Sequence, residues 1–282
     1  MLGRRAMRWQ AQRRSANVED RRGSRNALVG GGIGTLLVAL LVFFLGGNPS
    51  MLLGGGGGGP PQPGELTDEE RELGEFVSTV LASTEDVWHE LFRASGSEYR
   101  EPTLVLFSDQ TSSACGYAQA AVGPFYCPRD ANVYLDLAFF DELSRRFHAP
   151  GDFAQAYVVA HEVGHHVQDL LGTLDEAHAQ MERLDEAEAN RISVALELQA
   201  DYYAGVWGHH AAREGLIETS DIEEGLRAAS AIGDDRLQRQ SQGYVVPDSF
   251  THGTSEQRLT WFRRGLESGD PSQGDTFNAR DL

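Results

Sequence analysis

The spacing of apolar and polar residues divides the chain into an uncharged run, a spacer and a mainly helical remainder. After residue 65, apolar residues recur at intervals of three and four, which is the period of a helix face. The helices predicted from this pattern cover residues 68–81, 85–95, 137–147, 153–171, 174–190, 192–207, 221–232 and 257–266. Thr67, with Glu70 three residues later, and Thr84 are placed to cap the first two of these helices. Residues 103–107 and 132–136 have the length and pattern of strands. The sequence therefore predicts an α+β fold, mostly helical with a small sheet.

Residues 27–45 contain no charged side chain. As a helix this run would extend about 28 Å at about 1.5 Å per residue, enough to cross the hydrocarbon core of a bilayer. A cleaved signal peptide is the alternative, but its apolar run is usually shorter, roughly 7–15 residues, and is followed by a small-residue cleavage site. We therefore expect one transmembrane helix over residues 27–45.

The basic residues indicate how this helix would be oriented. Residues 1–26 contain eight Arg, opposed by Glu19 and Asp20 alone. Positive residues beside a span favour the cytoplasmic side, so we expect a single pass through the cell (inner) membrane, with residues 1–26 cytoplasmic and the catalytic domain extracytoplasmic. Residues 46–64 are rich in Gly and Pro, which is typical of a flexible linker. The folded domain is then expected to cover residues 65–282.

The charge and the cysteines narrow the class of protein. The chain has a net charge of −18 and contains no lysine. An acidic domain repels phosphate backbones, so nucleic acid is not an expected partner. Two cysteines cannot supply a four-thiolate zinc site. Because the domain is predicted to lie outside the cytoplasm, we expect Cys115 and Cys127 to form a disulfide. The alternatives are two buried free thiols or a pair of thiolates that binds zinc.

Residues 161–165 form the sequence H-E-x-x-H on a predicted helix. Positions i and i+4 share a helix face, so His161 and His165 can both bind one Zn²⁺. Glu162 lies beside them and can act as a general base on a metal-activated water. A chance match is the alternative, but the surrounding residues are apolar, and burying titratable side chains without a partner is costly.

A third metal ligand has to come from elsewhere in the chain. Gln168 and Leu171 occupy the Gly and final His positions of the longer pattern H-E-x-x-H-x-x-G-x-x-H, so that ligand is missing. Glu197 and Asp201 lie four residues apart in an apolar predicted helix and therefore share a face. Glu197 can bind the metal, and Asp201 can accept the free ring N–H of a histidine ligand.

Other residues could replace Glu197 as the third ligand. Three lie in a charged stretch that is typical of a solvated helix, and two follow the apolar segment: Glu182, Glu186, Glu188, His209 and His210. The shared face of Glu197 and Asp201 favours Glu197. We therefore predict one Zn²⁺ per chain, held by His161, His165 and Glu197.

Several stretches of the sequence resemble the bacterial neutral zinc metallopeptidase family, which is membrane-anchored. They are CGYAQAAVGPFYCPRDANVYLD, FAQAYVVAHEVGHHVQ, ELQADYYAGVW, AIGDDRLQ and PDSFTHGTSEQRLTWFRRGLESGDP. The resemblance covers most of the chain and implies a zincin-like domain with zinc endopeptidase activity. The family commonly has cysteines where Tyr202 and Gly274 stand here, so it also implies that a second disulfide is absent from this chain.

The E-x-x-x-D arrangement is also similar to that of the integral-membrane prenyl-protein endopeptidases. Those enzymes carry a His near the zinc with an Arg six residues later, and His252 and Arg258 have this spacing. The resemblance implies that both are catalytic and stabilise the negative charge that develops on the carbonyl oxygen. The alternative is local: Arg258 pairs with a surface carboxylate, and His252 caps a turn.

These features predict a membrane-anchored zinc endopeptidase that acts on a peptide or protein substrate. Residues 132–136 form either an edge strand along which a peptide pairs or an internal strand, since both have the same alternating pattern. A zinc-stabilised binding or scaffold domain of the envelope, with little turnover, is the alternative function. Glu162 favours the enzyme, because structural zinc sites are more often closed by four protein ligands.

Overall fold

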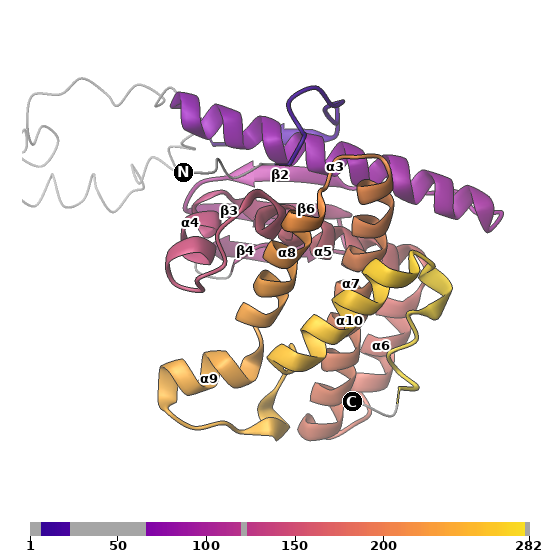
Figure 1. Ribbon diagram of the computed structural model, residues 1–282. Coiled ribbons are helices and arrows are strands. Elements are labelled where there is room, and N and C mark those ends of the chain that lie inside the picture. Colours follow the sequence, from indigo (N-terminus) through magenta and orange to yellow (C-terminus); the bar gives the residue numbers. More distant parts are fainter. Residues whose placement is uncertain (1–6, 23–65, 120–122, 280–282) are drawn as a thin grey trace, which may run out of the picture.

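The computed structural model describes residues 7–22, 66–119 and 123–279 (Figure 1). The predicted membrane span, residues 27–45, and the linker, residues 46–64, lie outside these ranges. None of the helices in the described ranges is both long enough and apolar enough to span a bilayer.

The described chain is mostly helical with a small sheet, which confirms the predicted α+β class. The helices are α3 (Asp68–Ala94), α4 (Ala138–Arg145), α5 (Asp152–Leu170), α6 (Thr173–Met181), α7 (Glu186–Arg213), α8 (Thr219–Ala231), α9 (Asp234–Gln242) and α10 (Ser255–Ser268). Two short 3-10 helices, η2 (Pro247–Ser249) and η3 (Pro271–Gln273), flank α10. The strands are β1 (Val18–Asp20), β2 (Thr103–Phe107), β3 (Gln110–Ser113), β4 (Gly116–Gln119), β5 (Phe125–Cys127) and β6 (Asn132–Asp136).

Helix α3 is continuous where the sequence predicts two helices. Its first turn carries the predicted capping box between Thr67 and Glu70. Thr84, however, does not begin a helix, because its hydroxyl donates to the carbonyl of Leu81 within α3. A threonine hydroxyl can bond a carbonyl of the preceding turn as well as cap a helix, so residue type alone does not distinguish the two positions.

The main sheet has the strand order β1-β2-β6-β5. Strands β1, β2 and β6 are parallel, and β5 pairs with β6 in the antiparallel direction. Residues 132–136 are therefore an internal strand, and the possibility that they form an edge strand is wrong. The edge strand next to them is β5, which has too few residues to show a strand pattern in the sequence. Strands β3 and β4 form a separate hairpin.

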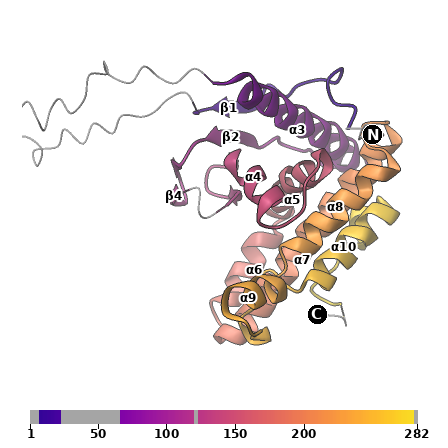
Figure 2. The same ribbon diagram turned by 60° about the vertical axis from the view of Figure 1, so that its left-hand side comes forward.

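Helix α5 lies at the centre of the domain. Helices α3 and α5 pack against each other and against the sheet, and α5 also contacts α7 and α8. Helix α10 lies along α7 on the side away from the sheet (Figures 1 and 2). Most of the buried apolar side chains form one core that extends from the sheet through α5 to these helices.

Residues 7–22 are part of this core. Met7 and Trp9 are buried, with 6% of Trp9 exposed, and the Trp9 ring contacts Phe76 of α3 edge-on with 5.5 Å between centroids. Strand β1 adds to the edge of β2. The folded domain therefore includes residues 7–22, ahead of its expected start at residue 65.

Polar contacts also attach the N-terminal segment. Glu85 of α3 is only 3% exposed and accepts hydrogen bonds from the Ser15 hydroxyl, the Asn17 amide and the Arg13 guanidinium. All three donors come from residues 7–22. Without this segment the Glu85 carboxylate would lose its partners, and a buried charge without partners is costly.

Replacing Trp9 by Ala should lower the free energy of unfolding by about 3–5 kcal/mol, because a large buried ring is removed from the core. Urea unfolding of the full chain in detergent, followed by circular dichroism, measures this change. The exposed Gln12 gives the matched control, and Gln12→Ala should stay within about 0.5 kcal/mol of wild type. If Trp9→Ala had the same free energy of unfolding as Gln12→Ala, the N-terminal segment would not contribute to the stability of the fold.

The C-terminal tail is fixed without a second disulfide. A Cβ atom added to Gly274 would lie 2.6 Å from the ring of Tyr202, so the two positions where the family resemblance implies cysteines are neighbours. The Tyr202 hydroxyl donates to the carbonyl of Asp270 at 2.6 Å and also contacts the Ser268 hydroxyl. The Gln199 amide donates to the carbonyl of Gly274 at 2.8 Å. Hydrogen bonds thus hold the tail where the cross-link is missing.

Candidate metal centre

The candidate site lies where helices α5 and α7 cross. Helix α5 carries His161 and His165 one turn apart, and α7 carries Glu197. Gly164 allows the close crossing, because a Cβ at this position would lie 2.8 Å from the carbonyl oxygen of Ala200. The glycine within the H-E-x-x-H sequence therefore brings the two helices together at the site.

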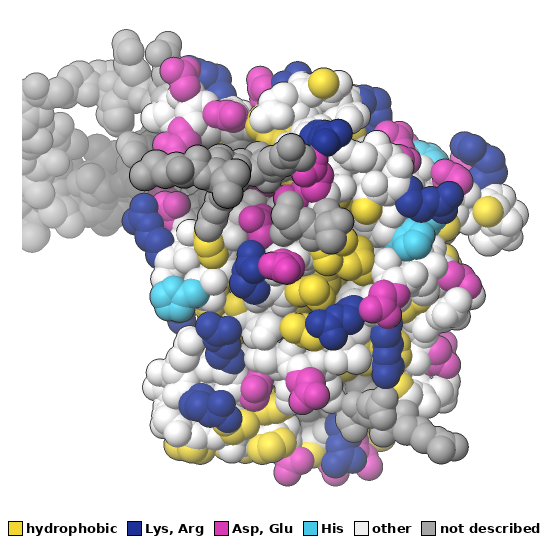
Figure 3. Space-filling model, in the orientation of Figure 1, with side chains coloured by type: hydrophobic (Ala, Val, Ile, Leu, Met, Phe, Trp, Pro, Cys, Tyr) yellow, Lys and Arg dark blue, Asp and Glu magenta, His cyan; other side chains and the backbone are white. Residues whose placement is uncertain are grey.

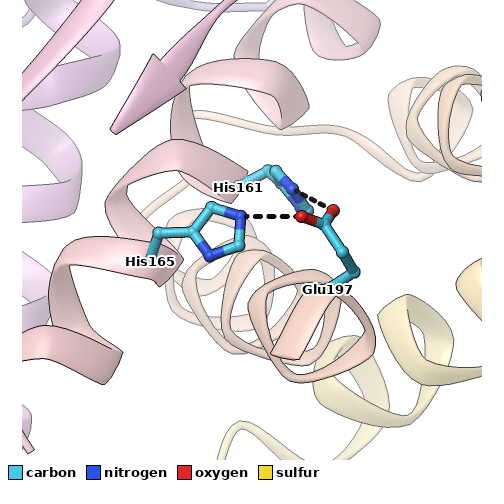
Figure 4. Close-up of side chains that lie close together, drawn as sticks. All are labelled: His161, His165 and Glu197. Carbon is cyan, nitrogen blue, oxygen red and sulfur yellow. Dashed lines mark ion pairs between the residues drawn. The ribbon is translucent and has the colours of Figure 1, made fainter. Parts of the chain in front are cut away.

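Three side chains meet at the crossing (Figure 4). The Nε2 atom of His161 lies 3.2 Å from Oε2 of Glu197, and the Nε2 atom of His165 lies 3.4 Å from Oε1. One ligand atom from each residue falls within 4.8 Å of the other two. The structure thus brings together the three residues that the sequence predicts as metal ligands.

Hydrogen bonds orient both imidazole rings toward this point. The Nδ1 atom of His161 lies 2.9 Å from a carboxylate oxygen of Asp201, and the Nδ1 atom of His165 lies 2.9 Å from the amide oxygen of Gln168. Both partners accept, so each Nδ1 carries the hydrogen and donates it. Each neutral ring then presents an Nε2 lone pair to Glu197, which is the tautomer that a metal ligand requires.

The cluster needs a positive charge at its centre. Two Nε2 lone pairs and a carboxylate face one another, and acceptors at this distance repel unless a proton or a cation lies between them. Burial opposes the charge on both groups, yet the carboxylates of Asp201 and Glu197 raise the pKa of His161 to about 10, and the two histidines hold the pKa of Glu197 well below its usual range. Two imidazoles and one carboxylate are a donor set that fits Zn²⁺.

Arg258 of α10 is attached to Asp201 behind the ligands. It is 2% exposed, and its Nε and Nη2 atoms donate to the two carboxylate oxygens of Asp201 at 2.8 and 3.0 Å. Burial opposes ionisation of Asp201, but Arg258 and His161 lower the pKa of this carboxyl. The Tyr157 hydroxyl also donates to Asp201. Arg258 pairs with a buried carboxylate rather than a surface one, and its Nη2 lies 3.7 Å from Oε2 of Glu197.

Glu162 projects into a cleft beside the cluster. It is 8% exposed, and no other described residue donates a hydrogen bond to its carboxylate. Burial raises its pKa above the ordinary value, which brings its basicity closer to that of a base working near neutral pH. The predicted base therefore lines the same cleft as the three ligand residues.

The cleft has a volume of about 630 Å³. One wall consists of the edge strand β5 and the turn before it, and much of the remaining wall is apolar, including Phe139, Leu174 and Leu196. The ligand residues, Glu162, His252 and Arg258 lie around the same space. Apolar side chains and the polar side chains of the ligand cluster line the same cleft, which suits the binding of a peptide chain.

His252 reaches the cleft from the loop before α10. Its side chain is 51% exposed, and its Nδ1 lies 3.0 Å from the Thr251 hydroxyl and 3.3 Å from Oδ1 of Asp234. The second oxygen of Asp234 accepts the backbone N–H groups of Thr251 and His252 at 2.8 and 2.6 Å. The contact with Asp234 raises the pKa of His252. One carboxylate at the start of α9 thus fixes both the loop and the ring.

The alternative ligands lie elsewhere. Three of them are exposed side chains: Glu182, Glu186 and Glu188. The other two contact the backbone at the end of α10, where His209 meets the carbonyl of Leu266 and His210 meets that of Gly269.

Three residues that the sequence analysis missed complete the site. Gln168, Tyr157 and Asp234 each bind a side chain of the cluster or the cleft. Gln168 fills the Gly position of the longer zinc pattern, and it also follows His165 by three residues and so shares its helix face. No spacing in the sequence indicates Asp234, because it contacts His252 from a separate element, helix α9.

Cys115 and Cys127 form the predicted disulfide. Cys127 ends strand β5, and Cys115 lies at the turn of the β3–β4 hairpin. The bond therefore ties the hairpin to the strand that forms one wall of the cleft.

Comparison with known sequences identifies the family. Residues 7–277 match the family described as "Putative neutral zinc metallopeptidase". The chain belongs to this family. It is 49% identical over 283 residues to "Uncharacterized protein YpfJ" of Escherichia coli (strain K12), which covers 96% of this chain and 99% of that protein.

A less similar relative matches a shorter part of the chain. It is "Uncharacterized protein Rv2575" of Mycobacterium tuberculosis (strain ATCC 25618 / H37Rv), 43% identical over 211 residues, or 71% of this chain and 69% of that protein. No solved structure matches the chain significantly. The family match begins at residue 7, so it includes the N-terminal segment that packs on the domain.

Proposed function

We propose that the protein is a membrane-anchored zinc endopeptidase with one Zn²⁺ per chain. The observation that carries this proposal is the convergence of two Nε2 atoms and the Glu197 carboxylate, with both Nδ1 atoms already bonded elsewhere. Glu162 lies beside this group on the cleft side. Zn²⁺ held there would act as a Lewis acid on the substrate carbonyl and would acidify a water molecule.

The side chains of the protein would carry the proton transfers and the positioning. The Glu162 carboxylate can take a proton from a water in the cleft and then deliver it to the leaving nitrogen of the substrate. Asp201 and Gln168 keep the two imidazoles in the ligand tautomer. Arg258 balances the charge of Asp201 and is close to Glu197, so we assign it to positioning these carboxylates.

Strand β5 supplies a place for the substrate backbone. Its partner β6 covers one edge, and the described sheet ends at β5, so the other edge can pair with an extended peptide. Phe125 and Tyr126 of this strand line the cleft with the metal ligands. A peptide added to β5 would therefore pass along the cluster.

We assign His252 to electrostatic stabilisation of the carbonyl oxygen, with Asp234 positioning it. If Nδ1 is bonded to Asp234, Nε2 can point into the cleft as a donor when the ring is protonated. Because Asp234 raises the pKa of His252, it extends the range of pH over which that donor is present.

His252→Ala is expected to lower kcat by roughly 10²-fold, the order of a lost oxyanion donor, with little change in KM. In Asp234→Asn the pKa of His252 should fall. The protonated ring is the donor. As pH rises, kcat should therefore begin to fall at a lower pH in Asp234→Asn than in the wild type. The pH profile of kcat measures this shift. An unchanged profile in Asp234→Asn, together with wild-type kcat in His252→Ala, would give both residues a structural role.

A peptide library tests the proposed function. The zinc-loaded full chain is incubated with the library, and new peptide ends are identified by mass spectrometry. Cleavage that a chelator stops and added zinc restores supports the endopeptidase. A zinc-loaded protein that leaves the library intact would favour the alternative, a zinc-stabilised binding domain.

A further inference from the structure

The chain leaves and re-enters the described domain at neighbouring points. Residue 22 ends the described N-terminal segment, and α3 begins two residues after residue 66. The Arg22 guanidinium is buried and donates to the carbonyl of Glu70 in the first turn of α3 at 2.6 Å. Gly74 leaves room for it, since a Cβ there would lie 2.5 Å from Nη2 of Arg22. Strand β1 and the start of α3 accordingly lie side by side (Figure 2).

The N-terminal segment is held along its whole length. Backbone bonds join Ser15 to Ser78, Asn17 to Leu104 and Arg21 to Leu106, at 2.8 to 3.1 Å. Met7, Trp9 and the partners of Glu85 add buried contacts at the other end. This segment completes the sheet and the core, so the fold as described requires it to be in the same compartment as the rest of the domain.

The arginines of this segment are used by the fold. Five of the eight Arg in residues 1–26 form ion pairs, with carboxylates of β1, of α3 or of Glu218: Arg8, Arg13, Arg14, Arg21 and Arg22. Basic and acidic side chains are interspersed on the face of the molecule in Figure 3. The basic N-terminus thus has a folding role that the positive-inside interpretation did not consider.

A single membrane pass between residues 22 and 66 is incompatible with these contacts. It would place residues 7–22 and α3 on opposite sides of about 30 Å of hydrocarbon. A segment cannot reach back through the bilayer as an irregular chain, because its backbone polar groups would be unsatisfied there.

We infer that residues 7–22 and 66–279 lie on the same side of the membrane. The inference does not depend on the proposed peptidase activity.

Labelling from outside the cell tests the inference on the full chain. Ala11→Cys and Ala179→Cys each add one thiol at an exposed position, in the N-terminal segment and in α6 respectively. The parent protein is the control, because its two cysteines form a disulfide. A membrane-impermeant maleimide is applied to intact and to permeabilised cells. We expect both thiols to react in intact cells, or both to react only after permeabilisation. If one thiol reacted in intact cells and the other reacted only after permeabilisation, the inference would be overturned.

A cross-link tests the contact in the membrane. Ser15→Cys with Ser78→Cys joins two residues whose backbones are bonded to each other, and a specific protease site replaces the glycines at 54–59. After mild oxidation and cleavage, the N-terminal fragment should remain attached on a denaturing, non-reducing gel. Ser15→Cys with the distant, exposed Ser241→Cys is the matched control and should release the fragment. Equal release from both pairs would overturn the inference.

Discussion

Glu162→Gln is expected to reduce kcat by roughly 10²–10⁴-fold while zinc stays bound. The substitution keeps the size and shape of the side chain but removes its ability to take up a proton. The three ligands, and the Asp201 and Gln168 contacts that orient them, do not involve Glu162, so metal binding should be unaffected. Burial in the wild type raises the pKa of Glu162, so the residue is a stronger base than an exposed carboxylate.

Peptide turnover and zinc content measured on the same sample separate the two effects. Glu182→Gln makes the same chemical change at an exposed position outside the cleft and should behave as wild type. If zinc-loaded Glu162→Gln retained kcat within about threefold of wild type, Glu162 could not be the general base.

Glu197→Ala is expected to lose zinc and, with it, all zinc-dependent cleavage. The variant leaves two imidazoles at the site, and structural and catalytic zinc sites in proteins use at least three protein ligands. Elemental analysis after dialysis against a weak chelator measures the occupancy. Glu188→Ala is the matched control, because Glu188 is an exposed glutamate of the same helix. Full zinc occupancy in Glu197→Ala would exclude Glu197 as a ligand.

The metal ligands could be predicted from the sequence because helical periodicity fixes their geometry. His161 and His165 share a face of α5 by spacing alone, and the same reasoning places Glu197 and Asp201 together on α7. The long apolar stretches around both pairs made these helices easy to recognise. Helical spacing does not predict that α5 and α7 cross at these residues. The crossing is predicted by charge, because two buried carboxylates need a positive partner.

Other parts of the site depend on contacts between distant segments. Strand β5 has three residues, and β1 pairs with β2 across more than 80 residues of sequence, so neither shows a pattern of its own. Asp234 approaches His252 from α9, which is strongly polar and carries little apolar periodicity. Such elements gain their structure from the core that they join, which local sequence does not encode.

The N-terminal segment shows how one feature can support two interpretations. A group of arginines before an uncharged run is typical of a cytoplasmic flank. The same arginines pair with carboxylates of a domain in a chain whose net charge is strongly negative. The distinction comes from tertiary contacts such as that of Arg13 with Glu85, which the sequence order of the two residues does not reveal.

The most direct test of the central claim is to titrate zinc into the metal-free full chain while peptide cleavage is followed. The account predicts that the cleavage rate rises in proportion to bound zinc and levels off at about one zinc per chain. The Glu197→Ala protein should show neither binding nor cleavage under the same conditions. The account would be contradicted if the cleavage rate did not change with zinc content. It would also be contradicted if the protein with one bound zinc per chain did not cleave the peptide.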